Sequence, residues 1–313
     1  MASLRSAFKR ALVGRPQSSA KLGETLLPKR IALPVFASDA LSSNAYATQE
    51  ILLVLSIGGA AYLSYTPWVA LGVVLVFFVV VASYRQNVHA YPSGGGDYEV
   101  ATVNLGANAG VVVASALLVD YVMTVAVSIA AAVDNIGSAF EPADEHRVFV
   151  AITLIALLAF ANLRGVRESG TAFAIPTYAF MVSIFFMVGW AIVRMLNGAE
   201  IRAESADWEL VAHSSFAGLT VAYLIARAFS SGTTALTGVE AISNGVPAFE
   251  KPKSKNAATT LLLLGVISMT MFASITWLAL HTGVQVADTD QHLIGLPAGD
   301  TQKTVIAQIA NAV

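Results

Sequence analysis

Four acidic residues lie within long apolar stretches of the sequence, where an ionisable side chain is costly. A carboxylate at the centre of a bilayer costs at least about 2.5–3.5 kcal/mol even on insertion scales, so a functional role is favoured for such residues. Glu50 lies near the end of its apolar stretch and fits a structural role better. We expect the other three, Asp39, Asp120 and Glu240, to bind a cation or to carry a proton.

Hydroxyl side chains accompany these carboxylates. Thr124 and Ser128 follow Asp120 at intervals of four residues, which places all three on one side of a helix. Tyr121 precedes Ser128 by seven residues and belongs to the same side. A lone Ser or Thr in a membrane helix more often holds helices together than binds a ligand. Beside a carboxylate and a tyrosine, we interpret this polar face as part of a binding site.

The composition shows what kind of elements must position these residues. Of the 313 residues, 56% are hydrophobic and 12% are charged, against about 25% charged residues in ordinary globular proteins. The apolar runs are long enough to cross a membrane, which excludes a soluble enzyme, a nucleic-acid-binding domain and a disordered chain. The absence of cysteine excludes disulfides and thiolate metal sites. We therefore expect an all-α integral membrane protein with seven spans, near residues 31–57, 67–83, 109–133, 148–161, 171–193, 216–242 and 257–280.

The first and sixth spans each contain a segment that is too polar for a lipid-facing helix, residues 36–50 and 230–244. Ser, Asn and Asp compete for backbone hydrogen bonds, and glycine weakens a helix. Irregular backbone within a membrane persists only where it lines a cavity or a binding site. We predict that both helices are broken, with the unwound residues Ser42, Ser43, Asn44, Ser231, Gly232 and Gly238.

The two interrupted segments resemble each other. Ala-Leu-Ser-Ser at residues 40–43 parallels Ala-Leu-Thr-Gly at residues 235–238, and the two spans run in opposite directions. Paired broken helices of opposite direction are typical of secondary transporters built from inverted repeats.

The distribution of Lys and Arg predicts the orientation and the domain organisation. Seven basic residues precede the first span, and alternate loops after it are also the more basic ones, which places the N-terminus in the cytoplasm. We expect a basic cytoplasmic segment at 1–30, a transmembrane domain at 31–281 and an extracellular segment at 282–313. Residues 299–313 have the pattern of an amphipathic helix that stops soon after it begins, so we expect the chain to be truncated there.

Three further features have a less specific interpretation. The glycine triplet at residues 94–96 would allow a tight entry into the third span, and no Lys-Ser/Thr follows it as a phosphate-binding loop would require. Arg227 lies just before the break in the sixth span, where an ion pair is favoured over contact with a substrate. The histidines show no metal-ligand spacing; they are His89, His146, His213, His281 and His292.

The motif Pro-Ser-Gly-Gly-Gly-Asp-Tyr at residues 92–98 and the two interrupted spans resemble the amino acid–polyamine–organocation (APC) superfamily of leucine-transporter-like fold. Residues 38–50, Asp120-Tyr121 and residues 235–244 are similar, more narrowly, to the KimA-type potassium importers. Asn44 departs from that pattern, which tends to have a small apolar residue there. The resemblance also implies an eighth to a tenth span that this chain lacks.

This resemblance implies a proton-coupled potassium symporter of the plasma (inner) membrane that works by alternating access and needs no cofactor besides the transported ions. It implies cation-binding roles for Asp39, Tyr46, Thr124, Ser128, Thr237 and Glu240, with Asp120 and Tyr121 beside them. Asp120 is the candidate for proton coupling, because like-charged neighbours favour the protonated form of one carboxyl group. The expected partners are the lipid bilayer, the transported ion and a second copy of the chain in a homodimer.

The chemistry of the residues leaves an alternative open within the same superfamily. Three carboxylates and several hydroxyls suit a cation such as potassium, which takes oxygen ligands. An amino-acid or polyamine permease is the alternative, although an amino-acid permease needs a pocket for the substrate carboxylate, usually formed by free backbone N–H groups. A seven-helix receptor is disfavoured, because the N-terminus is predicted to be cytoplasmic and residues 257–280 contain no lysine for a retinal. An enzyme is disfavoured because no nucleophile–base or metal spacing occurs.

Overall fold

The computed structural model describes residues 26–313 apart from 164–165, 214–215 and 298–299. Most of the predicted N-terminal segment therefore lies outside the described residues. The predicted spans are helices: α2 (Lys29–Ser56), α3 (Thr66–Ala90), α5 (Ala107–Ala139), α7 (Arg147–Asn162), α8 (Val166–Leu196), α9 (Leu219–Gly232) with α10 (Glu240–Asn244), and α11 (Lys253–Thr282). Shorter elements connect them: the 3-10 helices η2 (Ala60–Tyr65), η3 (Thr233–Leu236), η4 (Val246–Ala248) and η5 (Asp290–His292), the helices α4 (Gly96–Leu105), α6 (Glu141–Glu145) and α12 (Val305–Ala312), and the strands β1 (Glu209–Leu210) and β2 (Leu293–Ile294).

Four helical segments of the described chain are long and apolar enough to cross a membrane: Ala60–Ala90, Ala107–Ala139, Phe173–Leu196 and Lys253–Thr282. The apolar α7 is shorter, with 16 residues. The 28-residue α2 is not among the four, in keeping with the polar residues that it carries, and α9 and α10, with 14 and 5 residues, are too short by themselves. The all-α membrane fold is thus confirmed.

The first predicted break is wrong, because α2 is one continuous helix through the polar segment. Its polar side chains bond to their own helix. The hydroxyls of Ser42 and Ser43 donate to the carbonyl of Asp39 at 2.9 and 3.0 Å, and Asn44 Nδ2 donates to the carbonyl of Ala40 at 3.0 Å. Back-bonding of this kind bends a helix at most. Ser42, Ser43 and Asn44 are therefore helical.

The break in the sixth span is present, a few residues further along than predicted. Ser231 and Gly232 still belong to α9. The chain then forms η3, becomes extended at Thr237 (φ −57°, ψ 140°), passes through the left-handed region at Gly238 (φ +80°) and enters α10 at Glu240. Of the six residues predicted to be unwound, only Gly238 is. The inverted repeat stays a prediction, because one of its two breaks is absent.

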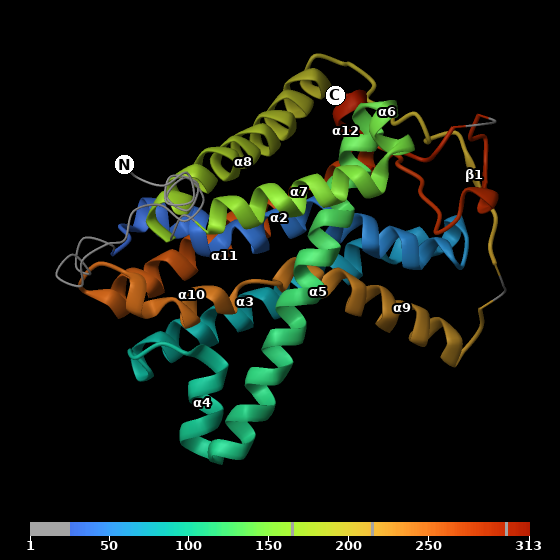
Figure 1. Cartoon of the computed structure of the whole chain (residues 1–313). Coiled ribbons are helices and arrows are strands. Elements are labelled where there is room, and N and C mark those ends of the chain that lie inside the picture. Colours follow the sequence, from blue (N-terminus) through green and yellow to red (C-terminus); the bar gives the residue numbers. More distant parts are fainter. Residues whose placement is uncertain (1–25, 164–165, 214–215, 298–299) are drawn as a thin grey trace, which may run out of the picture.

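The core surrounds α2, which packs against α11, α3, α8 and α9, while α5 crosses this group at an angle (Figure 1). Buried polar pairs join α2 to α11: Asn44 Nδ2 donates to Ser268 Oγ at 2.7 Å, and the hydroxyls of Thr48 and Thr276 lie 2.8 Å apart. Asn44 therefore faces α11. By contrast α5 exposes most of its apolar side chains, as a helix in contact with lipid would.

The glycine triplet leads into α4 and only then into α5, so it is not the direct entry into the third span that we predicted. Gly94, Gly95 and Gly96 have φ of +82°, +87° and +48°. A Cβ atom on Gly94 would overlap Pro247, and one on Gly96 would overlap Asn244. The glycines thus let this loop pack directly against α10 and η4.

At the end of the molecule away from the glycine triplet, residues 199–213 fold together with residues 283–297 and 300–313. The strands β1 and β2 pair antiparallel, with Leu210 opposite Leu293. The backbone N–H of Val305 donates to Gln49 Oε1 of α2 at 2.9 Å, and Arg194 of α8 donates to the carbonyl of Ala312 at 3.1 Å. The helix predicted within residues 299–313 is present as α12, packed on the bundle.

Candidate cation-binding site

The centre of the candidate site is the point where α2 passes the break between η3 and α10. Gly238 lies so close to Asp39 that an added Cβ atom would meet its carboxyl group. Ser43 Oγ lies 2.8 Å from Thr237 Oγ1 and 3.0 Å from the hydroxyl of Tyr46. Asp39, Tyr46 and Thr237, which were predicted from sequence, are thus brought together, and Ser43 is the residue that joins them.

Glu240 opens α10 on the other side of the break. Its Oε1 atom is buried and has no hydrogen-bond partner within the described part of the chain. Its carboxyl group interacts electrostatically with those of Asp39 and Asp120, so the three carboxylates form one group. The buried oxygen is an acceptor that a bound cation or proton would satisfy.

The polar face of α5 borders this group. Tyr121 OH accepts a hydrogen bond of 2.6 Å from Asn244 Nδ2 of α10. Thr124 and Ser128 are half-buried on the same face, and Ser128 Oγ is buried without a partner among the described residues. Asp120 is exposed, although it interacts electrostatically with Asp39 and Glu240.

Sequence reasoning missed Asp97 and Tyr84. Tyr84 OH of α3 donates to Asp97 Oδ2 of α4 at 2.7 Å, and Asp97 also interacts electrostatically with Glu240. The signal was available, because Asp97 follows the glycine triplet directly. Ser43 was predicted only as an unwound residue, since its hydroxyl contact with Thr237 depends on the tertiary fold.

Arg227 does not neutralise these carboxylates. It is exposed on α9 and forms no ion pair in the part of the chain that the structure describes. The predicted ion pair is therefore not found there. The site is left as a group of oxygen atoms from carboxylates and hydroxyls, which is the donor set that a hard cation prefers.

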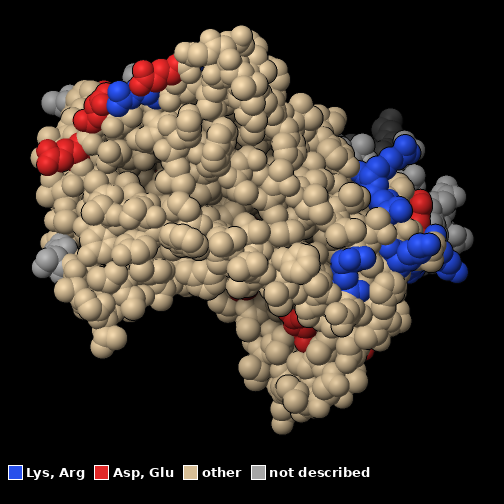
Figure 2. Space-filling view, turned by 180° about the vertical axis from the view of Figure 1, so that it is seen from behind, with Lys and Arg blue, Asp and Glu red and all other residues tan. Residues whose placement is uncertain are grey.

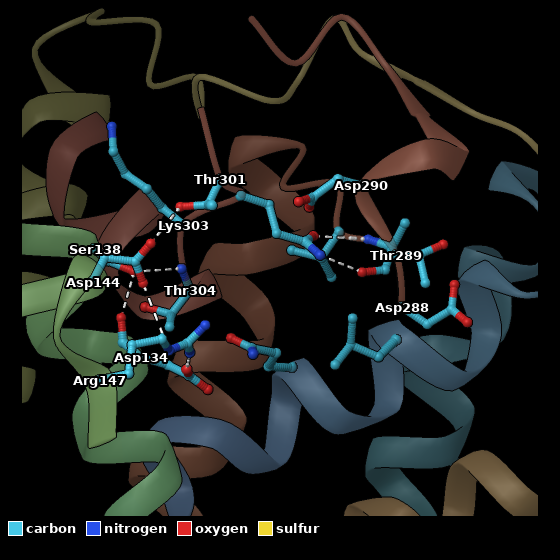
Figure 3. Close-up of a pocket in the computed structure, with 15 residues that line it drawn as sticks. Asp134, Ser138, Asp144, Arg147, Asp288, Thr289, Asp290, Thr301, Lys303 and Thr304 are labelled. Atoms are coloured by element: carbon cyan, nitrogen blue, oxygen red, sulfur yellow. Dashed lines mark hydrogen bonds and ion pairs between the residues drawn. The ribbon is translucent and has the colours of Figure 1, made fainter. Parts of the chain in front are cut away.

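A separate cavity of about 350 Å³ lies near α12, about 15 Å further along α2 from Asp39 at 1.5 Å per residue. Gln49 of α2 lines it, and Arg147 pairs with both Asp134 and Asp144 at one side (Figure 3). Lys303, which also lines it, pairs with Glu204 at 2.6 Å. This cavity contains none of the predicted cation-binding residues.

The described chain is thus a helical membrane bundle with a broken sixth span and carboxylates at the break. The amino acid permease family model of the APC superfamily matches residues 33–310, so the chain belongs to that family. Among known proteins it is similar to the potassium transporter KimA of Bacillus subtilis (strain 168), with 40% identity over 304 residues. The match covers 97% of this chain and 47% of that relative, so the chain spans about half the length of the transporter that it resembles.

This family membership confirms the prediction of a membrane-embedded transport protein and places the chain outside the enzymes.

Proposed function

We propose that this chain forms part of a potassium importer that couples uptake to protons by alternating access. The observation that carries the proposal is the cluster of oxygen atoms around the break, from Asp39, Ser43, Tyr46, Thr237 and Glu240. The similarity to a protein named as a potassium transporter supports the same cargo.

The backbone at the break favours a cation over an amino acid. An amino-acid carboxylate would need free N–H groups there. Three of the five N–H groups between Thr237 and Ala241 already donate to carbonyls of their own segment: those of Thr237, Val239 and Ala241, at 3.1, 3.4 and 3.2 Å. Carboxylates on both sides of the break would in addition repel an anionic substrate group.

Coupling to protons would follow from the grouping of three carboxylates. Groups of like charge at close range cannot all ionise without a penalty, and their titrations are linked. A potassium ion would offset one negative charge, and a proton on Asp120 would offset another. We place the proton on Asp120 because Asp39 and Glu240 lie directly at the break, where the cation would bind.

The distribution of charge supports a cytoplasmic N-terminus. Figure 2 shows Lys and Arg gathered at one end of the molecule, a mixed group of acidic and basic residues at the other end, and a broad uncharged surface between them. At the basic end, Lys29 begins α2, and Lys251 and Lys255 flank the start of α11. The positive-inside rule would place this end in the cytoplasm and residues 282–313 outside.

Growth of a bacterial strain that lacks its own potassium uptake tests the proposal. The complete gene should restore growth at low potassium, and membrane vesicles containing the protein should accumulate radioactive rubidium, a potassium analogue. Asp39→Asn and Glu240→Gln should abolish both, while Asp207→Asn, an exposed carboxylate paired with Arg202, should not. Uptake of an amino acid in place of rubidium would refute the proposed cargo.

A further inference from the structure

Two histidines and an aspartate that lie far apart in the sequence meet near the end of α2. His213, Asp288 and His292 each offer one ligand atom, and these atoms all lie within 4.8 Å of one another. We expected no metal-ligand arrangement among the histidines, because their spacing along the chain gives none. The structure corrects that expectation for this pair.

The short sheet builds the cluster. The pairing of β1 with β2 continues as a hydrogen bond of 2.9 Å from the N–H of Val211 to the carbonyl of His292. His213, two residues further on, is then the diagonal neighbour of His292 on the same face. The N–H of His213 donates to the carbonyl of Ile57 at 3.0 Å, which anchors this segment to the end of α2.

The side chains lie close enough together to share one ion. The two imidazole rings stack with centroids 3.5 Å apart, and His213 Nε2 lies 2.7 Å from Asp288 Oδ1. The hydroxyl of Thr289 lies 2.7 Å from His292 Nδ1. A hydrogen bond to one ring nitrogen orients the ring and leaves the other nitrogen, here Nε2, for a metal. The side chains of His213 and Asp288 are 27% and 37% exposed, so an ion can reach them.

We propose that His213, Asp288 and His292 bind a divalent transition-metal ion, with zinc as the best match. Two imidazoles and one carboxylate are a common set of three protein ligands for zinc, and water takes the fourth position. Nitrogen ligands distinguish this site from the oxygen cluster at the break, which suits a hard cation. The proposal does not depend on the transported substrate.

The bound ion would add a link between two segments that the short sheet and a small buried cluster of Leu210, Ala287 and Leu293 already hold together. His213 precedes α9, the helix that leads to the break, whereas Asp288 and His292 follow α11. Asp288 also lines the cavity near α12, on the side away from Asp134 and Arg147 (Figure 3). A metal ion would therefore tie the segment at His213 to the segment that follows α11.

Titration calorimetry of the purified chain in detergent with zinc chloride tests the site. We expect one zinc ion per chain, with binding weakened at least about tenfold in His213→Gln and in His292→Gln. His281→Gln is the matched control, because His281 lies at the same end of α11 and stacks on Trp277 instead. Unchanged zinc binding in the double variant His213→Gln/His292→Gln, or an equal loss in His281→Gln, would refute the site.

A second variant guards against loss through misfolding. Thr289→Val removes only the hydroxyl that orients His292, so it should keep the metal-free melting temperature and still weaken zinc binding. Zinc should also raise the melting temperature of the wild-type chain, because a ligand that binds only the folded state stabilises it. No shift with zinc in excess would count against the proposal, and neither readout involves transport.

Discussion

Ser43 shows how one hydroxyl group can organise a binding site. It lies within hydrogen-bond distance of Thr237 across the break and of Tyr46 one turn along its own helix. Its position thus sets the distance between α2 and the unwound segment. Removal of the hydroxyl of Ser43 or of Thr237 should therefore change the affinity for the cation more than it changes the stability of the fold.

We predict that Thr237→Val weakens cation binding and leaves the protein folded. A hydrogen bond of this kind contributes about 0.5–1.5 kcal/mol, which corresponds to a rise of about two- to tenfold in the rubidium concentration for half-maximal uptake. Thr233→Val is the control, because the hydroxyl of Thr233 is exposed and donates only to the carbonyl of Ser230. Equal effects of the two substitutions would argue against a role for Thr237 in binding.

We predict that a neutral side chain at position 120 weakens proton coupling more than it weakens cation binding. Asp120→Asn should weaken the dependence of uptake on the pH gradient, while rubidium binding changes less. Both quantities are to be measured on one preparation. A collapse of affinity with coupling unchanged would instead assign Asp120 to the cation, and loss of folded protein would indicate a structural role.

At the scale of residues, the sequence indicated the carboxylates of the site but not the contacts of Asp97, Ser43 and the histidine cluster. The carboxylates were recognisable because an acidic residue in an apolar span is rare and costly. Their partners were not, because contacts such as Tyr84–Asp97 and His213–His292 join segments that only the folded chain brings together.

Among the elements, the broken sixth span was predictable and the intact first span was not. Both segments are rich in polar residues, but only the sixth has a glycine in the left-handed region, at Gly238. In α2 the same kind of side chain bonds back to the helix or, like Asn44, reaches α11. Composition does not distinguish these outcomes, because they depend on the neighbouring helices.

Gly238→Ala should disrupt the break. A residue other than glycine in the left-handed backbone region destabilises the folded state by about 1–2 kcal/mol. The added Cβ atom would in addition overlap Asp39. We expect a lower melting temperature and loss of uptake. Gly189→Ala, in the middle of α8 with open space around it, should be neutral or slightly stabilising. A fully active Gly238→Ala protein would show that the close approach of Asp39 is not required.

The contact between α2 and α11 predicts a purely structural effect. Asn44→Ala removes a buried hydrogen bond to Ser268, so it should destabilise the protein by about 1–3 kcal/mol, measured as a fall in melting temperature. The exposed Asn197, which donates only to the carbonyl of Val193, provides the control Asn197→Ala. Cation selectivity should stay unchanged, and a change in it would place Asn44 in the binding site.

For the whole molecule, the absence of cysteine allows a clean test of orientation. We predict that Glu200→Cys reacts with a membrane-impermeant thiol reagent in intact cells, whereas Lys255→Cys reacts only after the cells are opened. Both positions are exposed in the structure. The reverse pattern would overturn the cytoplasmic placement of the N-terminus.

The hydrogen bond from Asn244 to Tyr121, together with the glycine loop packed against Asn244 and Pro247, would act as a latch on the α4 side of the site. If potassium leaves on that side, its dwell time is governed by how often the latch opens and less by how tightly the oxygen atoms hold the ion. The glycines let the surfaces meet closely, so opening them must separate well-fitted backbone as well as break one hydrogen bond. The speed of such a carrier would then depend on contacts between protein segments as well as on the atoms that hold its ion.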